Sequence, residues 1–218
     1  DKLWIGTKSG GSILNCATQR FEFPTPFDSL RMNNNIMAFS LSTDGIWIAN
    51  RFGKLIHYNK TTKQAQSYSR DNMEGLPGSF LSLCDNKKGK LYIGHVEEGM
   101  SILDLKTKKL KHYRHDPGNP ESLPGDRVYS IYIDHLENIW VGTHQGLALF
   151  NPLTEKFHVF RYNPHDPNSL ISDHIYEITE MNDNELWIAT DIGGISILDL
   201  RSISYMNSSP IKFKNITA

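Results

Sequence analysis

Five positions along the chain carry side chains of different chemistry at one repeated place. Each lies four residues after an aromatic residue, and the five are Lys8, Arg51, Val96, His144 and Asp191. Guanidinium, imidazole and carboxylate groups suit hydrogen bonding to the hydroxyl or carboxylate groups of a ligand. With His95 taken from the third copy, the candidate ligand-binding residues are Lys8, Arg51, His95, His144 and Asp191. Free variation of exposed turn residues is the simpler explanation, and it stays open.

The aromatic residues that mark these positions belong to a repeat. Their segments span residues 3–7, 46–50, 91–95, 139–143 and 186–190, and the aromatic positions are separated by 43, 45, 48 and 47 residues. A period of roughly 40–50 residues is typical of a β-propeller blade and is too long for a leucine-rich repeat. We therefore expect the candidate residues to lie at equivalent turns of successive blades.

Each aromatic segment has the same surroundings. An alternating apolar segment precedes it, at 36–41, 80–84, 128–134 and 175–181, and a short Asp/Asn/Gly turn joins the two. A glycine turn and two further alternating segments follow. Such turn residues tolerate the backbone of a tight hairpin, so the pattern predicts four antiparallel strands, named A to D, and no helix. The aromatic residue fills the space between sheets, and the Gly or Ala two residues later admits side chains of a neighbouring blade.

The fold class predicted is all-β, a β-propeller of four-stranded antiparallel blades, with four complete blades and a fifth that lacks strand A. The expected bounds are 1–30 for the partial blade and about 33–70, 79–115, 126–163 and 173–216 for the others. The C-terminal segment could supply the missing strand and close a five-bladed ring. An arc of a larger propeller is favoured, because the tail lacks the polar turn that follows strand A.

Composition excludes several classes of function. The formal net charge is -1, so the basic excess of a nucleic-acid-binding protein is missing. The pattern contains no nucleotide, nucleophile-elbow or metal-ligand motif, so we expect no catalytic residue, no cofactor and no metal.

Cys16 and Cys84 are expected to be free, buried thiols. The lysines of the third blade are interpreted as solvated turn residues; they are Lys87, Lys88, Lys90, Lys106, Lys108, Lys109 and Lys111.

Two His-Asp-Pro triplets lie in the long connections between strands D and A, at 115–117 and 165–167. Adjacent His and Asp could suggest a metal site or an acid–base pair. A rigid turn held by local hydrogen bonds from side chains to the backbone is the simpler interpretation. We expect both triplets to occupy one place in the repeat and to be part of the frame.

The fourth and fifth blades resemble the two-component regulator propeller repeat. The residues that carry the likeness are Tyr113-Arg114-His115-Asp116-Pro117, Ser122-Leu123, Val128-Tyr129-Ser130-Ile131, Asp134 and Ile139-Trp140-Val141-Gly142-Thr143. The next blade repeats the order with 165–170, 175–178 and 186–190, while the likeness is looser around 70–100. The resemblance implies the periplasmic sensor part of a hybrid two-component histidine kinase from polysaccharide-degrading gut bacteria, and an oligosaccharide as ligand.

The predicted function is therefore a non-catalytic extracytoplasmic sensor module that recognises an oligosaccharide and regulates polysaccharide utilisation. The expected partners are the remaining blades and downstream domains of a parent chain, with a homodimer as a further option and no nucleic acid. Two alternatives stay open. One is a propeller enzyme, a polysaccharide lyase or glycosidase, and the other is a protein-interaction scaffold.

Overall fold

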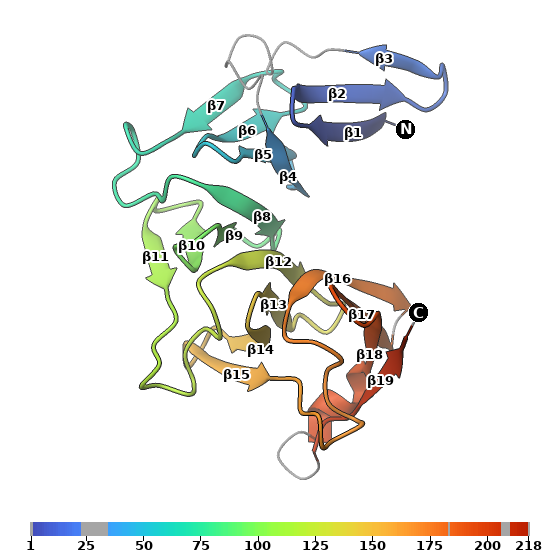
Figure 1. Ribbon diagram of the computed structural model, residues 1–218. Helices are drawn as coiled ribbons and strands as arrows, with labels where there is room; N and C mark the ends of the chain where they lie inside the picture. The colour runs from blue at the N-terminus through green and yellow to red at the C-terminus, as the bar shows by residue number, and fades with distance from the viewer. Residues whose placement is uncertain (1, 23–34, 183, 206–209, 218) are drawn as a thin grey trace. The chain divides into compact units, whose positions relative to one another are not determined.

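The chain folds almost entirely into antiparallel sheets. A computed structural model describes residues 2–22, 35–182, 184–205 and 210–217, and Figure 1 shows its strands in chain order. The described residues form one three-stranded sheet and four four-stranded sheets, each with its strands paired in sequence order. This confirms the predicted all-β propeller-blade fold, including a first blade without strand A. The predicted bounds at residues 30 and 33 lie outside the described residues.

The first three sheets occupy the N-terminal half of the chain. The first contains β1 (Lys2–Thr7), β2 (Gly10–Asn15) and β3 (Arg20–Glu22). The second contains β4 (Ile36–Leu41), β5 (Gly45–Asn50), β6 (Leu55–Asn59) and β7 (Ala65–Tyr68). The third contains β8 (Phe80–Asp85), β9 (Lys90–His95), β10 (Met100–Asp104) and β11 (Leu110–Tyr113).

The last two sheets complete the described chain. The fourth contains β12 (Val128–Ile133), β13 (Ile139–Thr143), β14 (Gly146–Asn151) and β15 (Lys156–Phe160). The fifth contains β16 (Ile175–Asn182), β17 (Glu185–Thr190), β18 (Ile195–Asp199) and β19 (Phe213–Ile216). Contacts divide the chain into two compact units, residues 1–96 with 101–112 and residues 97–100 with 113–218. The arc of a larger propeller stays a prediction.

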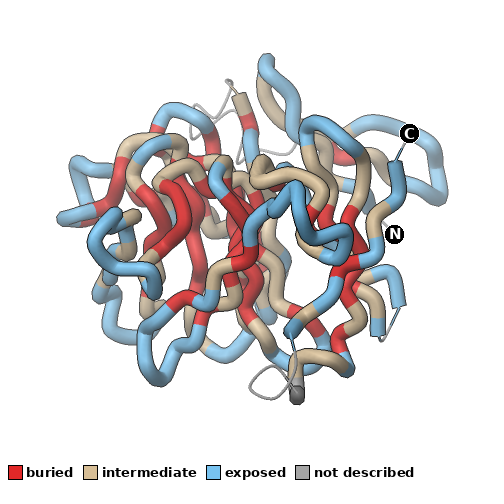
Figure 2. Tube along the Cα trace, turned by 60° about the horizontal axis from the view of Figure 1, so that its bottom comes forward, coloured by how far each residue is buried: buried red, intermediate tan, exposed pale blue. Residues whose placement is uncertain are grey.

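At two of the five positions, Gly6 and Gly142, the small residue after the aromatic lets the next sheet approach, as predicted. A Cβ on Gly142 of β13 would lie 2.7 Å from Cγ2 of Ile175 in β16. The equivalent Cβ on Gly6 would lie 2.8 Å from Cγ2 of Ile36 in β4. At these two places strand A therefore packs against strand B of the preceding blade at a distance that leaves no room for a Cβ on Gly6 or Gly142. Figure 2 shows that the buried residues gather in the strands, whereas the connecting loops are exposed.

The repeated tryptophans are core residues to different degrees. Trp47 and Trp140 are 2% and 0% exposed, while Trp4 and Trp187 are half-buried. Three of the indole N–H groups donate to carboxylates near the A–B turns, at 3.0 Å from Trp47 to Asp85, 2.8 Å from Trp140 to Asp134 and 3.3 Å from Trp187 to Glu185. A buried indole N–H requires such an acceptor, so the Trp and the turn carboxylate act together.

Two local predictions were wrong. Residues Leu200–Tyr205 form a short 3-10 helix after β18, where no helix was expected. Its start is held by Asp199, whose carboxylate accepts the backbone N–H of Arg201 and whose carbonyl accepts the Ser202 hydroxyl. Cys16 is exposed and Cys84 is half-buried, so these free thiols are not both core residues. Cys16 lies in the turn just after β2, which places it outside the packed strands.

The two His-Asp-Pro triplets occupy different places in the repeat, which corrects their predicted equivalence. The Ser122 hydroxyl binds the backbone N–H and carbonyl of Asp116, and the Ser169 hydroxyl binds the same two groups of Asn163. Asn163 is therefore the equivalent of Asp116, and the second triplet lies three residues further along its loop. Both triplets take part in the expected turns, since Asp116 and Asp166 each accept the backbone N–H two residues later.

The contact between sheets predicts the effect of one substitution. We expect Gly142→Ala to lower the free energy of unfolding by about 1–3 kcal/mol, because the added Cβ meets Ile175 at 2.7 Å. Gly118→Ala is the matched control, since its Cβ would meet its nearest atom at 3.4 Å and should change stability by less than about 0.5 kcal/mol. Urea unfolding measures both, and equal effects would contradict the proposed close approach.

Candidate ligand-binding site

The turns between strands B and C are built on one repeated backbone hydrogen bond. The first residue after strand B donates its N–H to the carbonyl of the residue just before strand A of the same sheet. The bonds run from Arg51 to Asn35 at 3.0 Å, Val96 to Ser79 at 3.4 Å, His144 to Arg127 at 3.2 Å and Asp191 to His174 at 3.2 Å. The structure thus pairs four of the five tip residues with a second residue, which can carry its own side chain to the same surface.

In the first unit, Lys8 and Arg51 lie on the two sides of Asn35. The Asn35 N–H donates to the Lys8 carbonyl at 2.9 Å, and its carbonyl accepts the Arg51 N–H. Both Lys8 and Arg51 are exposed. The backbone therefore brings these two predicted residues close together, with both cationic side chains open to solvent.

His95 differs from the other candidates because it is buried. It is 0% exposed, and its two ring nitrogens contact the Ser79 carbonyl at 3.3 Å and the Ser101 hydroxyl at 2.5 Å. The Ser101 hydroxyl also contacts Nδ1 of His112 at 2.8 Å. Burial lowers the pKa of His95 to about 4, so the ring is neutral at pH 7. His95 holds strands β9 and β10 together and is not presented to a ligand.

Every complete blade carries a β-bulge near the start of strand A. The register between strands A and B shifts at Met37, Leu81, Tyr129 and Tyr176. A bulge bends the strand and redirects the side chain of its extra residue. In the second unit this position is a tyrosine in both blades, and Tyr176 is 46% exposed. The bulges thus present two aromatic rings from neighbouring strands.

The two tyrosines form a cluster with His174 and Asp191, which we call the bulge cluster. The centroid of the Tyr129 ring lies 4.9 Å from that of Tyr176 and 5.2 Å from that of His174, and the His174 and Tyr176 rings stack at 5.0 Å. His174 contacts Asp191 Oδ2 through Nδ1 at 2.6 Å and the Tyr129 hydroxyl through Nε2 at 3.1 Å. Aromatic surface and directed polar groups therefore meet at one place.

Arg127 and His144 lie beside the bulge cluster, since Arg127 hydrogen-bonds Tyr129 and His144 interacts with His174. A hydrogen bond to Tyr129 raises the pKa of Arg127, and Glu97 adds to this by accepting from its guanidinium at 3.0 Å. Burial lowers the pKa of His144 below its ordinary value, and the positive charge of Arg127 acts in the same direction. His144 is therefore neutral at pH 7, so it offers a hydrogen bond rather than a charge.

Of the five predicted residues, Asp191 belongs to this cluster, and His144 lies near enough to interact electrostatically with His174. Sequence reasoning missed Arg127, Tyr129, His174 and Tyr176. One signal was present, because Tyr129 and Tyr176 occupy the same place in two consecutive repeats, where the earlier repeats have Met37 and Leu81. That both positions are bulged, and that His174 lies between them, required the strand register.

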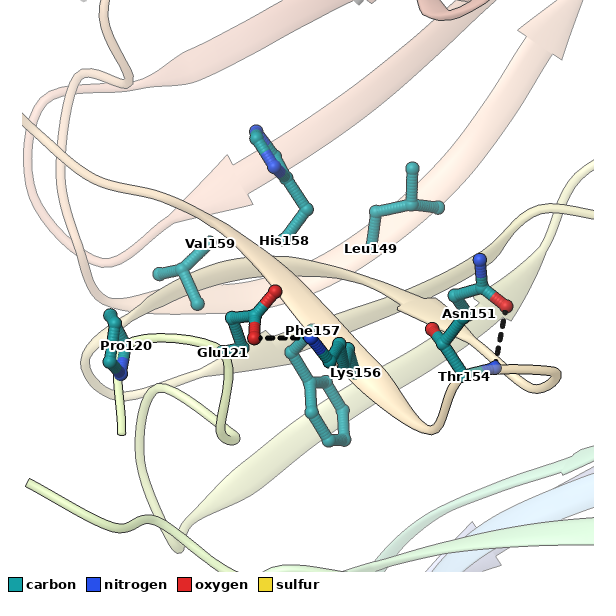
Figure 3. Close-up of a pocket in the computed structure, with 9 residues that line it drawn as sticks. All are labelled: Pro120, Glu121, Leu149, Asn151, Thr154, Lys156, Phe157, His158 and Val159. Atoms are coloured by element: carbon teal, nitrogen blue, oxygen red, sulfur yellow. Dashed lines mark hydrogen bonds and ion pairs between the residues drawn. The ribbon is translucent and has the colours of Figure 1, made fainter. Parts of the chain in front are cut away.

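A separate pocket of about 410 Å³ lies at the outer edge of the fourth sheet (Figure 3). The loop before β12 covers this edge, because the Glu121 carbonyl accepts the Phe157 N–H at 2.9 Å and its carboxylate pairs with Lys156 at 2.7 Å. The fifth sheet has the same cover, since the Asn168 carbonyl accepts the Phe213 N–H at 2.8 Å. Covering an outer strand prevents pairing with other chains, so we interpret this pocket as part of the frame.

One segment of the chain matches a known protein family. Residues 122–145 match the family model of the two component regulator propeller. This confirms the resemblance drawn from the residues of the fourth blade. No curated protein matches the chain.

Among solved structures, the chain is similar to the extracellular domain of a hybrid two component system from B. thetaiotaomicron, with 33% identity and a TM-score of 0.79 over 100% of this chain and 27% of that chain. The extracellular domain of a one component system from the same organism matches with 18% identity and a TM-score of 0.73, over 99% and 26%. The β-propeller domain of Cps50 (Swd1) from Myceliophteria thermophila matches with 14% identity and a TM-score of 0.70, over 99% and 67%. The last two show the fold alone. The chain spans about a quarter of the length of the two bacterial proteins.

Within the described part of the chain, no helix has the length and apolar character that a membrane span would need. The same residues contain no group of three or more His, Cys, Asp or Glu side chains arranged to hold a metal ion.

The buried imidazole of His95 predicts a pH dependence. An unfolded histidine with a pKa near 6.5 takes up its proton before the folded one, whose pKa is about 4. Stability is therefore fully present above pH 6.5 and falls as the pH drops toward 4, by up to about 3 kcal/mol. We expect His95→Gln to be less stable at pH 7 but to lose most of this slope, in urea unfolding at pH 7 and pH 5. His165→Gln, an exposed control, should keep the slope; parallel slopes in all three proteins would contradict the assignment.

Proposed function

We propose that this chain is a non-catalytic sensor module from the extracytoplasmic part of a two-component signalling protein. The observation that carries the proposal is the similarity over the whole chain, at 33% identity, to the extracellular domain of a hybrid two component system. The match of residues 122–145 to the two component regulator propeller supports the same class.

The ligand proposed is an oligosaccharide, bound at the bulge cluster. Sugar rings present an apolar face that packs on aromatic rings and hydroxyl groups that need directed hydrogen bonds. Tyr176 supplies an exposed ring, and Asp191, His174 and Tyr129 supply a chain of polar groups beside it. Tight packing between sheets holds these groups in place, so the site is largely formed before a ligand arrives.

Signalling requires partners beyond this chain. We propose that binding shifts a two-state equilibrium in the parent protein, through further blades, downstream domains or a second copy, and so controls polysaccharide utilisation. The proposal includes a histidine kinase activity in the parent protein and a periplasmic location for this chain.

The site is tested by replacing its exposed ring. We expect Tyr176→Ala to weaken binding of the recognised oligosaccharide by about tenfold or more, measured by calorimetry with oligosaccharides released from plant and host polysaccharides. The melting temperature should hardly change, because the ring is 46% exposed. Tyr162→Ala is the matched control, since Tyr162 lies in the same unit, is 49% exposed and is outside the cluster. Equal affinity of all three proteins would place the site elsewhere, and failure of the wild type to bind any oligosaccharide would count against the ligand class.

A second candidate function is supported by the two hydrogen bonds of His174, one to the Asp191 carboxylate and one with the Tyr129 hydroxyl. A carboxylate that orients a histidine, which in turn contacts a hydroxyl, is an arrangement suited to proton transfer. In a polysaccharide lyase such groups would remove the proton next to a uronate carboxylate and protonate the leaving oxygen. Incubation with uronate-containing polysaccharides tests this, with unsaturated product as the readout. Turnover that is lost in His174→Ala or His144→Ala would overturn the non-catalytic assignment.

A further inference from the structure

A second pocket, of about 300 Å³, lies between the second and third sheets of the first unit. It is at the A–B and C–D turns, so it is at the opposite ends of these strands from the B–C turns described above. The second sheet contributes the A–B turn at residues 42–44 with Trp47, His57, Gln66 and Tyr68. The third sheet contributes Asp85, Lys87, Gly89, Leu105 and Lys108.

Two lysines of the third sheet, Lys87 and Lys108, line this pocket, and five more lie on the same turns and the strands beside them. The Leu105 N–H donates to the Gly89 carbonyl at 2.9 Å, which places the A–B turn beside the C–D turn. Lysines occupy seven positions in or beside these turns, and Lys90 alone of them is half-buried, paired with Asp104 at 3.0 Å. The exposed ones are Lys87, Lys88, Lys106, Lys108, Lys109 and Lys111. In a chain with a net charge of -1, this is a local concentration of positive charge.

The backbone of the C–D turn does not explain these lysines. The Asp104 carboxylate accepts the N–H groups of Lys106 and Thr107, as Asn59 and Asn151 do in the equivalent turns. The next residue has a left-handed backbone in all three, with φ of 60° at Lys108, 60° at Lys63 and 61° at Glu155. The same turn therefore forms with a glutamate at this position, so the turn geometry does not require the positive charge of Lys108.

Two carboxylates, Asp44 and Asp85, also line the pocket, and each accepts hydrogen bonds from other groups of the chain. Asp85 is 8% exposed and accepts the Trp47 indole N–H at 3.0 Å and the Lys87 backbone N–H at 2.6 Å. Asp44 accepts the Ser42 hydroxyl at 3.1 Å and the Asn59 amide at 2.8 Å, and it faces His57 at 3.1 Å. Lys108 contacts the Tyr68 hydroxyl at 3.4 Å. The two lysines thus share the pocket lining with two carboxylates that already accept hydrogen bonds within the chain.

We propose that this lysine-lined pocket binds an organic phosphate or sulfate ester. Lys87 and Lys108 are the cationic groups that neutralise the ester, and the Thr43 hydroxyl and the Gln66 amide hydrogen-bond its oxygens and the organic part. The site is separate from the bulge cluster, because it shares no residue with it and lies in the first unit. It stands whether or not the bulge cluster binds a sugar.

The test compares two esters and two matched variants in the intact chain. Calorimetry is run with glucose 6-phosphate, glucose 6-sulfate and uncharged glucose at low ionic strength. We expect both esters to bind with a Kd below about 1 mM and glucose not to bind. The double variant Lys87→Gln/Lys108→Gln should weaken binding by about tenfold or more. The double variant Lys60→Gln/Lys63→Gln removes the same charge from the equivalent turn of the second sheet, outside the pocket, and should change affinity by less than about twofold.

A second measurement does not depend on any variant. Addition of the bound ester to the wild type should shift the NMR signals of the Trp47 indole N–H and the Gln66 side-chain amide, which line the pocket. Three results would overturn the proposal. They are absence of ester binding, equal weakening in both double variants, and binding to phosphatidylglycerol vesicles without binding to either ester.

Discussion

The packing of strand A against the glycine or alanine of the preceding strand B is the contact on which the rest of the structure depends. At Gly142, Ile175 approaches so closely that a single added methyl group has no room, and Gly6 and Ile36 repeat the arrangement. This contact sets the spacing of neighbouring sheets and the starting point of each strand A. The bulge follows one residue later, so the contact also sets the direction of Tyr176. The packing of neighbouring sheets therefore determines where the side chains of the bulge cluster lie.

Within one blade, the residues whose interactions recur from sheet to sheet can be distinguished from exposed residues that differ between sheets. Hydrogen bonds from Asp, Asn, Ser and Thr side chains to the backbone hold the turns, and covering loops protect the outer strands at Phe157 and Phe213. These interactions recur from sheet to sheet. The side chains just outside them differ, as with Tyr129 against Leu81 at the bulge and Lys108 against Glu155 at the C–D turn. A repeated frame with different residues at its exposed positions is how one fold can present different binding surfaces.

The sequence was sufficient for the blades, because an aromatic period of 43 to 48 residues and alternating apolar segments leave few other folds. It was less informative about the site. His144 and Asp191 were predicted from their place at the turns, but His95 is the last residue of β9 and is buried, in contact with Ser101 of the next strand. Pairing of His174 with Asp191 joins residues 17 positions apart, through a backbone contact that no periodicity reveals. The two His-Asp-Pro triplets look equivalent as letters, yet the serine bonds show a shift of three residues between them.

Hydrogen–deuterium exchange with and without a saturating oligosaccharide tests most directly whether the bulge cluster is the ligand-binding site. Binding there should slow exchange at residues 127–130, 174–177 and 189–194, where the bulges and the last B–C turn meet. Protection confined to the outer strands β15 and β19, or to the loops that cover them, would contradict the assignment.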